Sequence, residues 1–316
     1  MLINPINQLK KIGLILVIYI SVITAAQAKL VILACEPEWA VLAHEIGKNL
    51  VSVTSATHAK QNPHYIEARP SLISAARKAN LVIGTGAELE DGWLPVVLQK
   101  ANQPKIHKGQ MGYLMFSDFI ELQNSAASLE SRVESSIDRA MGDIHAAGNP
   151  HIQLDPRIYL VASKILAERL GQLDVNNAVF YQKNYLAFKQ KWENKLRLWA
   201  IQAQPLKGMK IVVYHDNWVY LNHWLGLDQV TTLEPKPGVP PSAAYLKTVL
   251  LKTQKEKAQV ILRTTYDPIE ATKWLHQKTG VPVLELAFTV GGNDQSKDLF
   301  ELFDDIVKQL LLRLNK

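Results

Sequence analysis

The run LVILA at Leu30–Ala34 predicts a β-strand that is buried on both faces, because it is short, apolar and rich in branched side chains. A segment of helical period follows it, at Trp39–Leu50. Two further apolar runs, Val51–Thr54 and Leu81–Gly84, enclose a helical segment at Pro70–Asn80. Strands that alternate with helices in this way predict a parallel sheet with crossover helices.

A second series of the same kind begins with KIVVY at Lys210–Tyr214 and continues through Gln259–Leu262 and Val281–Leu286. Between the two series no segment is predicted as a strand, and Asp155–Gln204 has a helical pattern. Asp155-Pro156 predicts the start of a first helix, which Gly171 would end.

A second helix is predicted from about Asp174 to Gln204, where proline and glycine are absent. At 1.5 Å per residue it would be about 45 Å long, enough to connect two lobes. We therefore expect an α/β fold of two parallel-sheet, Rossmann-like lobes, residues 29–173 and 208–316, joined by one long rigid helix within residues 174–207. A helical connector is stiffer than a glycine-rich hinge, so we expect small shifts between the lobes.

The composition is that of an ordinary folded protein. Hydrophobic residues make up 47% and charged residues 20% of the 316 residues, which excludes disordered, collagenous and disulfide-scaffold classes. The net charge is +6, and no run of five like charges occurs. The excess positive charge therefore indicates a solvated surface, and no nucleic-acid partner is expected.

Residues 1–28 have the layout of a secretory signal peptide. Lys10-Lys11 precedes an uncharged apolar run at Ile12–Thr24, and Ala26-Gln27-Ala28 is a small-x-small cleavage site. The apolar run is shorter than the roughly 20 residues that a membrane-spanning helix needs. We expect cleavage after Ala28 and an exported mature chain.

The single cysteine, Cys35, excludes an intramolecular disulfide. Leu33-Ala34-Cys35 also resembles a lipoprotein cleavage site, but cleavage there would remove the strand at Leu30–Ala34. A small buried side chain at the end of that strand is the preferred interpretation, with lipidation as the alternative.

Enzyme and nucleotide motifs are absent: the sequence has no GxGxxG after a strand, no phosphate loop, no HExxH, no GxSxG and no CxxC. Three of the nine histidines lie where parallel sheets deliver functional groups, in loops after strands or before helices. His64 precedes the helix at Pro70, His151 precedes Asp155, and His215 ends the strand at Lys210–Tyr214.

Two of these histidines follow a proline, Pro63 or Pro150, whose restricted backbone aims the imidazole in advance. Three neutral imidazoles from separate loops suit a borderline-soft divalent ion, and zinc above all. His64, His151 and His215 are therefore the predicted metal ligands, although each alone could be an ordinary surface or core residue.

Several segments in their order resemble one known family. Asn62-Pro63-His64-Tyr65 followed by Arg69-Pro70-Ser71, Pro150–Pro156 before a long helix, Val212–His215, and Glu234–Ser242 are similar to segments of the substrate-binding proteins of zinc-type metal ABC transporters. The resemblance covers essentially the whole chain after the leader. It implies a metal site in the cleft between the lobes, with His64 and His151 from the first lobe and His215 from the second.

The chain departs from this family in two places. Many relatives supply a fourth ligand as an aspartate near the C-terminus, and Phe288 stands at that position here. Asp294, Glu36 or a water are the candidates for the fourth ligand. The long histidine-rich loop of zinc members is reduced to His145. Asp216 is a candidate for orienting an imidazole, or else an ordinary helix N-cap.

The leader predicts an exported, periplasmic protein, and we expect a monomer. The resemblance implies that it is not an enzyme but captures Zn2+ and delivers it to the permease of an ABC importer in the inner membrane. Because metal binding requires deprotonated imidazoles, affinity should fall as the pH drops through about 6.5. A manganese or iron(II) carrier of the same fold is the first alternative, although such harder ions favour carboxylates. A zinc hydrolase with Glu36 or Asp294 as base is the second.

Overall fold

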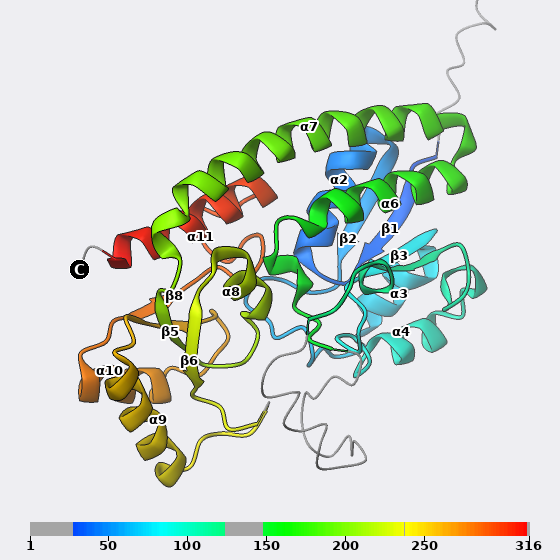
Figure 1. Cartoon of the computed structure of the whole chain (residues 1–316). Helices are drawn as coiled ribbons and strands as arrows, with labels where there is room; N and C mark the ends of the chain where they lie inside the picture. The colour runs from blue at the N-terminus through cyan, green and yellow to red at the C-terminus, as the bar shows by residue number, and fades with distance from the viewer. Residues whose placement is uncertain (1–27, 124–147, 237, 315–316) are drawn as a thin grey trace, which may run out of the picture.

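The computed structural model describes residues 28–123, 148–236 and 238–314 (Figure 1). The predicted leader, apart from its last residue, and His145 lie outside these ranges. Two four-stranded sheets form the fold, and every strand pairing in them is parallel. The predicted fold class is therefore confirmed. No helix in the described ranges is long and apolar enough to cross a membrane.

The first sheet has the strand order β2-β1-β3-β4. Its strands are β1 (Leu30–Ala34), β2 (Val51–Ser55), β3 (Leu81–Gly84) and β4 (Tyr113–Met115), and its helices are α2 (Pro37–Gly47), α3 (Pro70–Lys78) and α4 (Leu94–Ala101). The predicted central run forms β1, between β2 and β3. Ile32, Leu33 and Ala34 are buried, as expected for a strand covered on both faces.

The second sheet repeats this topology in the order β6-β5-β7-β8. Its strands are β5 (Lys210–Val213), β6 (Asp228–Thr232), β7 (Val260–Arg263) and β8 (Val283–Glu285), and its helices are α8 (Val219–Leu225), α9 (Ala243–Glu256) and α10 (Glu270–Thr279). In both sheets the first strand in sequence lies at the centre, so the loops after β1 and β5 open at equivalent places.

The sequence interpretation missed two strands, and it was wrong to place none between the two series. β4 has only three residues and lies at the edge of its sheet, beyond β3. β6 is also an edge strand, and Val230 is its one buried residue. β4 is buried at Leu114 and Met115, but three residues are too short a run to be recognised as a strand. β6 is mostly polar, because only one strand and part of one face cover it.

The two middle helices form, with shifted ends. α6 (Ile158–Leu173) begins two residues after the predicted Asp155-Pro156 start and passes through Gly171, so the predicted end was wrong. Asp155 still holds the chain before the helix, because its Oδ1 accepts the Arg157 amide at 2.9 Å. α7 (Ala178–Gln202) has 25 residues and is the expected connector.

α7 lies along one side of the molecule, over α2 and α6 at its first half and over the C-terminal helix α11 (Leu299–Leu314) at its second (Figure 1). Trp192 stacks at 5.2 Å on Phe188 and contacts Phe303 of α11 at 5.8 Å between ring centroids. Trp199 donates to Asp304 of α11 at 2.7 Å.

α11 also contacts α2 of the first lobe. One continuous buried apolar cluster includes residues of β1 and of β5. The lobes are therefore held by a shared core in addition to the connector, while the residue boundaries assigned to them stay a prediction.

Candidate metal site

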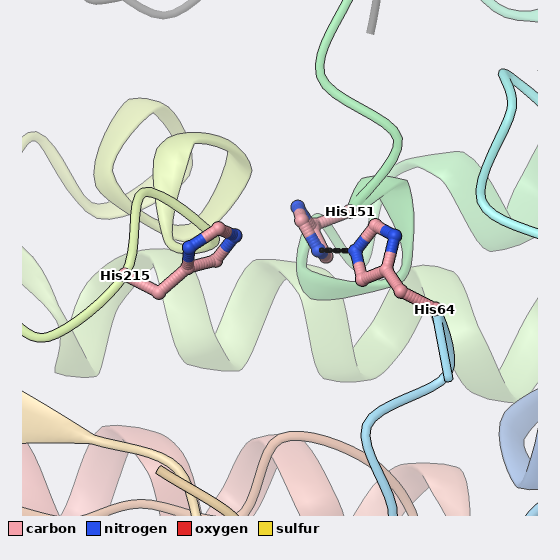
Figure 2. Close-up of side chains that lie close together, drawn as sticks. All are labelled: His64, His151 and His215. Carbon is pink, nitrogen blue, oxygen red and sulfur yellow. Dashed lines mark hydrogen bonds between the residues drawn. The ribbon is translucent and has the colours of Figure 1, made fainter. Parts of the chain in front are cut away.

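The structure brings His64, His151 and His215 together from three separate loops. His64 lies between β2 and α3, His151 precedes α6, and His215 follows β5. One ring nitrogen of each histidine lies within 4.8 Å of those of the other two. The Nε2 atoms of His64 and His151 are 3.4 Å apart, and the His215 ring points toward this pair from the opposite side (Figure 2).

An Asn-Pro-His turn aims each of the first two histidines. Asn62 Oδ1 accepts the His64 backbone amide at 3.0 Å, and Asn149 Oδ1 accepts that of His151 at the same distance. An asparagine side chain that bonds to the backbone two residues later closes a tight local turn. Together with the proline between them, this turn fixes the backbone from which each imidazole projects.

Two neighbouring side chains orient the rings of His151 and His215. Asn149 Oδ1 lies 2.9 Å from His151 Nδ1, and Glu234 Oε2 lies 2.6 Å from His215 Nδ1. Each oxygen is an acceptor, so it favours the tautomer with a proton on Nδ1. The lone pair of Nε2 is then directed into the space that the three histidines share.

This geometry fits one tetrahedral metal ion. At metal–nitrogen distances of about 2.0 to 2.1 Å, two nitrogens on one zinc lie about 3.3 Å apart. The observed 3.4 Å between Nε2 of His64 and of His151 is close to that separation. His151 is 2% exposed and His64 9% exposed, so water reaches the site from a restricted direction.

The histidines open into a pocket of about 160 Å³. Its walls come from both lobes and are formed by Asn62, His64, Tyr65, His151, Tyr214, His215, Glu234, Gly238, Pro240, Tyr266, Asp267 and Pro268. Burial raises the pKa of the Asp267 carboxyl, and the Thr264 amide and the nearby His215 partly offset this. Phe288 packs against His151, with the two ring centroids 5.6 Å apart.

The other candidate residues lie elsewhere. Asp294 is exposed and does not line the pocket. Asp216 does not orient an imidazole through its carboxylate, because its Oδ1 accepts from Gln229 at 2.9 Å. Its backbone oxygen instead accepts from Asn149 Nδ2 at 2.7 Å.

Glu36 belongs to a second buried group, with Cys35 and Glu90, at the carboxyl ends of β1 and β3. Glu90 accepts the Thr85 amide at 2.7 Å, and Glu36 accepts the same amide at 3.3 Å. Burial raises the pKa of Glu90 to about 7 and, with the nearby Glu90 and Glu38 carboxylates, raises the pKa of Glu36 well above its usual range. Burial therefore disfavours the charged form of the Glu36 carboxyl, which makes it a poor substitute for a fourth ligand.

Sequence reasoning missed Glu234, Asn149 and Asp267 as parts of the site. The repeated Asn-Pro-His was a usable signal for Asn149, because the same residue precedes both proline-histidine pairs. Glu234 follows β6, the unrecognised edge strand, so its position beside His215 had no basis in the predicted elements. Asp267 lies in the loop after β7, where a parallel sheet also presents functional groups.

Comparison with known proteins identifies the family to which this chain belongs. The chain matches the family described as "Zinc-uptake complex component A periplasmic" over residues 32–311. The chain belongs to this family. Its match extends over both lobes and includes all three histidines.

Relatives of known role are similar across most of their length. The metal ABC transporter substrate-binding lipoprotein SloC of Streptococcus mutans is 22% identical over 294 residues, 89% of this chain and 90% of the relative. The manganese ABC transporter substrate-binding lipoprotein PsaA of Streptococcus pneumoniae is 22% identical over 306 residues, 92% and 93% of the two chains. A crystal structure of ZnuA matches with a TM-score of 0.69 at 22% identity, covering 89% of this chain and 98% of that one.

Members of the zinc-uptake component A family and these relatives are substrate-binding proteins of metal ABC transporters, and not enzymes. The hydrolase alternative therefore has no support. The names of the relatives include a manganese transporter beside the zinc-uptake description of the family. Membership in the family therefore establishes that the substrate is a metal ion. Which metal ion it is has to be inferred from the chemistry of the site.

Proposed function

We propose that this protein captures Zn2+ between His64, His151 and His215 and delivers it to the permease of an ABC importer. The observation that supports zinc is the donor set: three imidazole nitrogens converge, while an apolar Phe288 lies against His151. Harder ions such as Mn2+ and Fe2+ favour carboxylate oxygen, whereas imidazole suits zinc. No carboxylate lies in the group of mutually close donors that the histidines form in the described part of the chain.

Capture and release follow from how the ligands are carried. Two ligands come from the first lobe and one from the second, so a relative displacement of the lobes lengthens at least one metal bond. The shared core and α7 resist a wide opening. Docking on the permease releases the ion by a small displacement of one ligand-bearing loop, because a partner shifts an equilibrium only through its preference for one state.

The proposed location is the periplasm, after cleavage behind Ala28. The relatives are substrate-binding lipoproteins and the family is described as periplasmic, in accord with a position outside the cytoplasm. Lipidation at Cys35 would require cleavage in front of that residue and would remove β1. Since β1 pairs with both β2 and β3 at the centre of its sheet, the loss would break the first lobe.

Metal content and competition titration with zinc, manganese and iron(II) test the proposal. We expect one tightly bound zinc per chain, strongly weakened in His151→Ala. His44→Ala is the matched control, because His44 is an exposed residue of α2. Manganese that binds as tightly as zinc, or a His151→Ala variant that binds zinc as well as the parent, would refute the assignment.

A further inference from the structure

The three histidines leave the fourth position of a tetrahedral ion to another donor. Phe288, which stands where many relatives have an aspartate, presents an aromatic ring to His151 and has no donor atom. Two carboxylates line the pocket, those of Glu234 and Asp267. The fourth donor is therefore one of these two carboxylates or a water molecule that one of them holds.

Glu234 is already committed through both of its oxygens. Oε2 lies 2.6 Å from His215 Nδ1, and Oε1 accepts the Gly238 amide at 3.1 Å. Moving this carboxylate to a metal ion would release the His215 ring, which is itself a proposed ligand. Glu234 consequently acts on the site through His215 and not as a direct ligand.

Asp267 faces the same pocket from the loop after β7. Its side chain is 7% exposed, and its Oδ2 accepts the Thr264 amide at 2.7 Å. The Asp267 backbone oxygen accepts from the Arg263 guanidinium at 2.9 Å, so hydrogen bonds hold both the side chain and the main chain of this residue. The side chain is therefore held in place in the wall of the pocket that His215 also lines.

The distance from the histidines decides how Asp267 acts. No carboxylate oxygen of Asp267 lies within 4.8 Å of a ring nitrogen of all three histidines, as that of a direct ligand would. A water on the metal lies about 2.0 to 2.2 Å from it and donates to a carboxylate over about 2.5 to 2.7 Å. A carboxylate that binds through such a water is then about 4 Å or more from the metal. The pocket of about 160 Å³ has room for this water, which occupies about 30 Å³.

We propose that a water completes the metal shell and that Asp267 is the positioning residue that accepts its hydrogen bond. This inference rests on the proposed zinc site. The negative charge of Asp267 also has a selective effect, because it stabilises a water that donates hydrogen bonds and repels small anions that compete for the same position. Asp267→Asn should therefore change two affinities in opposite directions.

Cobalt(II) replaces zinc in the experiment, since its visible spectrum reports the fourth ligand. We expect zinc affinity, measured by competition, to fall about tenfold in Asp267→Asn, as for other groups that orient a metal shell. Azide, titrated into the cobalt-loaded protein, should bind at least several-fold more tightly in Asp267→Asn than in the parent. Asp294→Asn is the matched control, because Asp294 is an exposed aspartate of the same lobe.

Each result is decisive. Weaker zinc binding with tighter azide binding supports the role of Asp267. A variant that equals the parent in both titrations overturns it, and so does a fall in both affinities, which indicates a damaged pocket. His151→Ala separates the two proposals: if it loses zinc while Asp267→Asn behaves as the parent, the zinc site stands and only the role of Asp267 is wrong.

Discussion

Replacing Glu234 tests whether the orientation of His215 controls metal affinity. The Glu234 carboxylate lies 2.6 Å from His215 Nδ1, and the two side chains are only 11% and 14% exposed, so solvent screens the contact weakly. Glutamine keeps one oxygen, which can accept from His215 or from the Gly238 amide, but not readily from both. Loss of such an outer partner lowers metal affinity by about 10- to 100-fold, which is about 1.4 to 2.7 kcal/mol. We expect Glu234→Gln near the lower limit and Glu234→Ala near the upper one.

The assay is zinc competition against a fluorescent chelator, with chemical unfolding of the metal-free protein run in parallel. Glu193→Gln makes the same chemical change on α7, where Glu193 pairs with Lys189 at 3.8 Å on the surface, and should leave affinity unchanged. If Glu234→Gln and Glu234→Ala both bind zinc within twofold of the parent, His215 is oriented by other contacts and the reasoning fails. A large loss of stability in the metal-free variants would show a structural role instead.

Three other predictions concern the fold. Trp192→Ala should lower the free energy of unfolding in urea by about 3 to 5 kcal/mol, because Trp192 is fully buried among aromatic rings; Leu186→Ala, at an exposed site, should change it by less than about 0.5 kcal/mol. Burial raises the pKa of Glu38 from 4.5 to about 7. The folded state then keeps a proton that the unfolded state releases. The free energy of unfolding should therefore fall as the pH rises from about 5 to 7, by about 3 kcal/mol for this group. An equally steep fall in Glu38→Gln would contradict this. Small-angle scattering should give the same profile with and without zinc, and a wide hinge rotation would rule out the shared-core argument.

The central strands were predictable because burial on both faces demands an uninterrupted apolar run. β1 and β7 are such strands, and their residues are recognisable without any knowledge of their partners. β6 reads Asp-Gln-Val-Thr-Thr and takes its strand conformation from pairing with β5. A polar edge strand of this kind is set by tertiary contacts, so a local pattern does not identify it.

The proposed ligands were likewise easier to predict than the groups that support them. His64 and His151 follow proline at loop positions that parallel sheets use for function, and His215 directly follows an apolar strand, so all three were recognisable from their sequence positions. Glu234 and Asp267 follow edge strand β6 and inner strand β7, and their closeness to His215 depends on how those strands pack. Glu36, next to the end of β1, was a reasonable candidate by sequence position, but its side chain turns toward Glu90 and Thr85.

The return of α11 to the first lobe has a consequence for the order in which the chain can fold. A ribosome makes α2 and α7 long before it makes residues 299–314, and domains commonly fold as units while synthesis continues. Here the aromatic face of α7 receives Phe300 and Phe303 only when α11 has been synthesised. The aromatic face of α7 therefore stays incompletely packed in the nascent chain until residues 299–314 have been made.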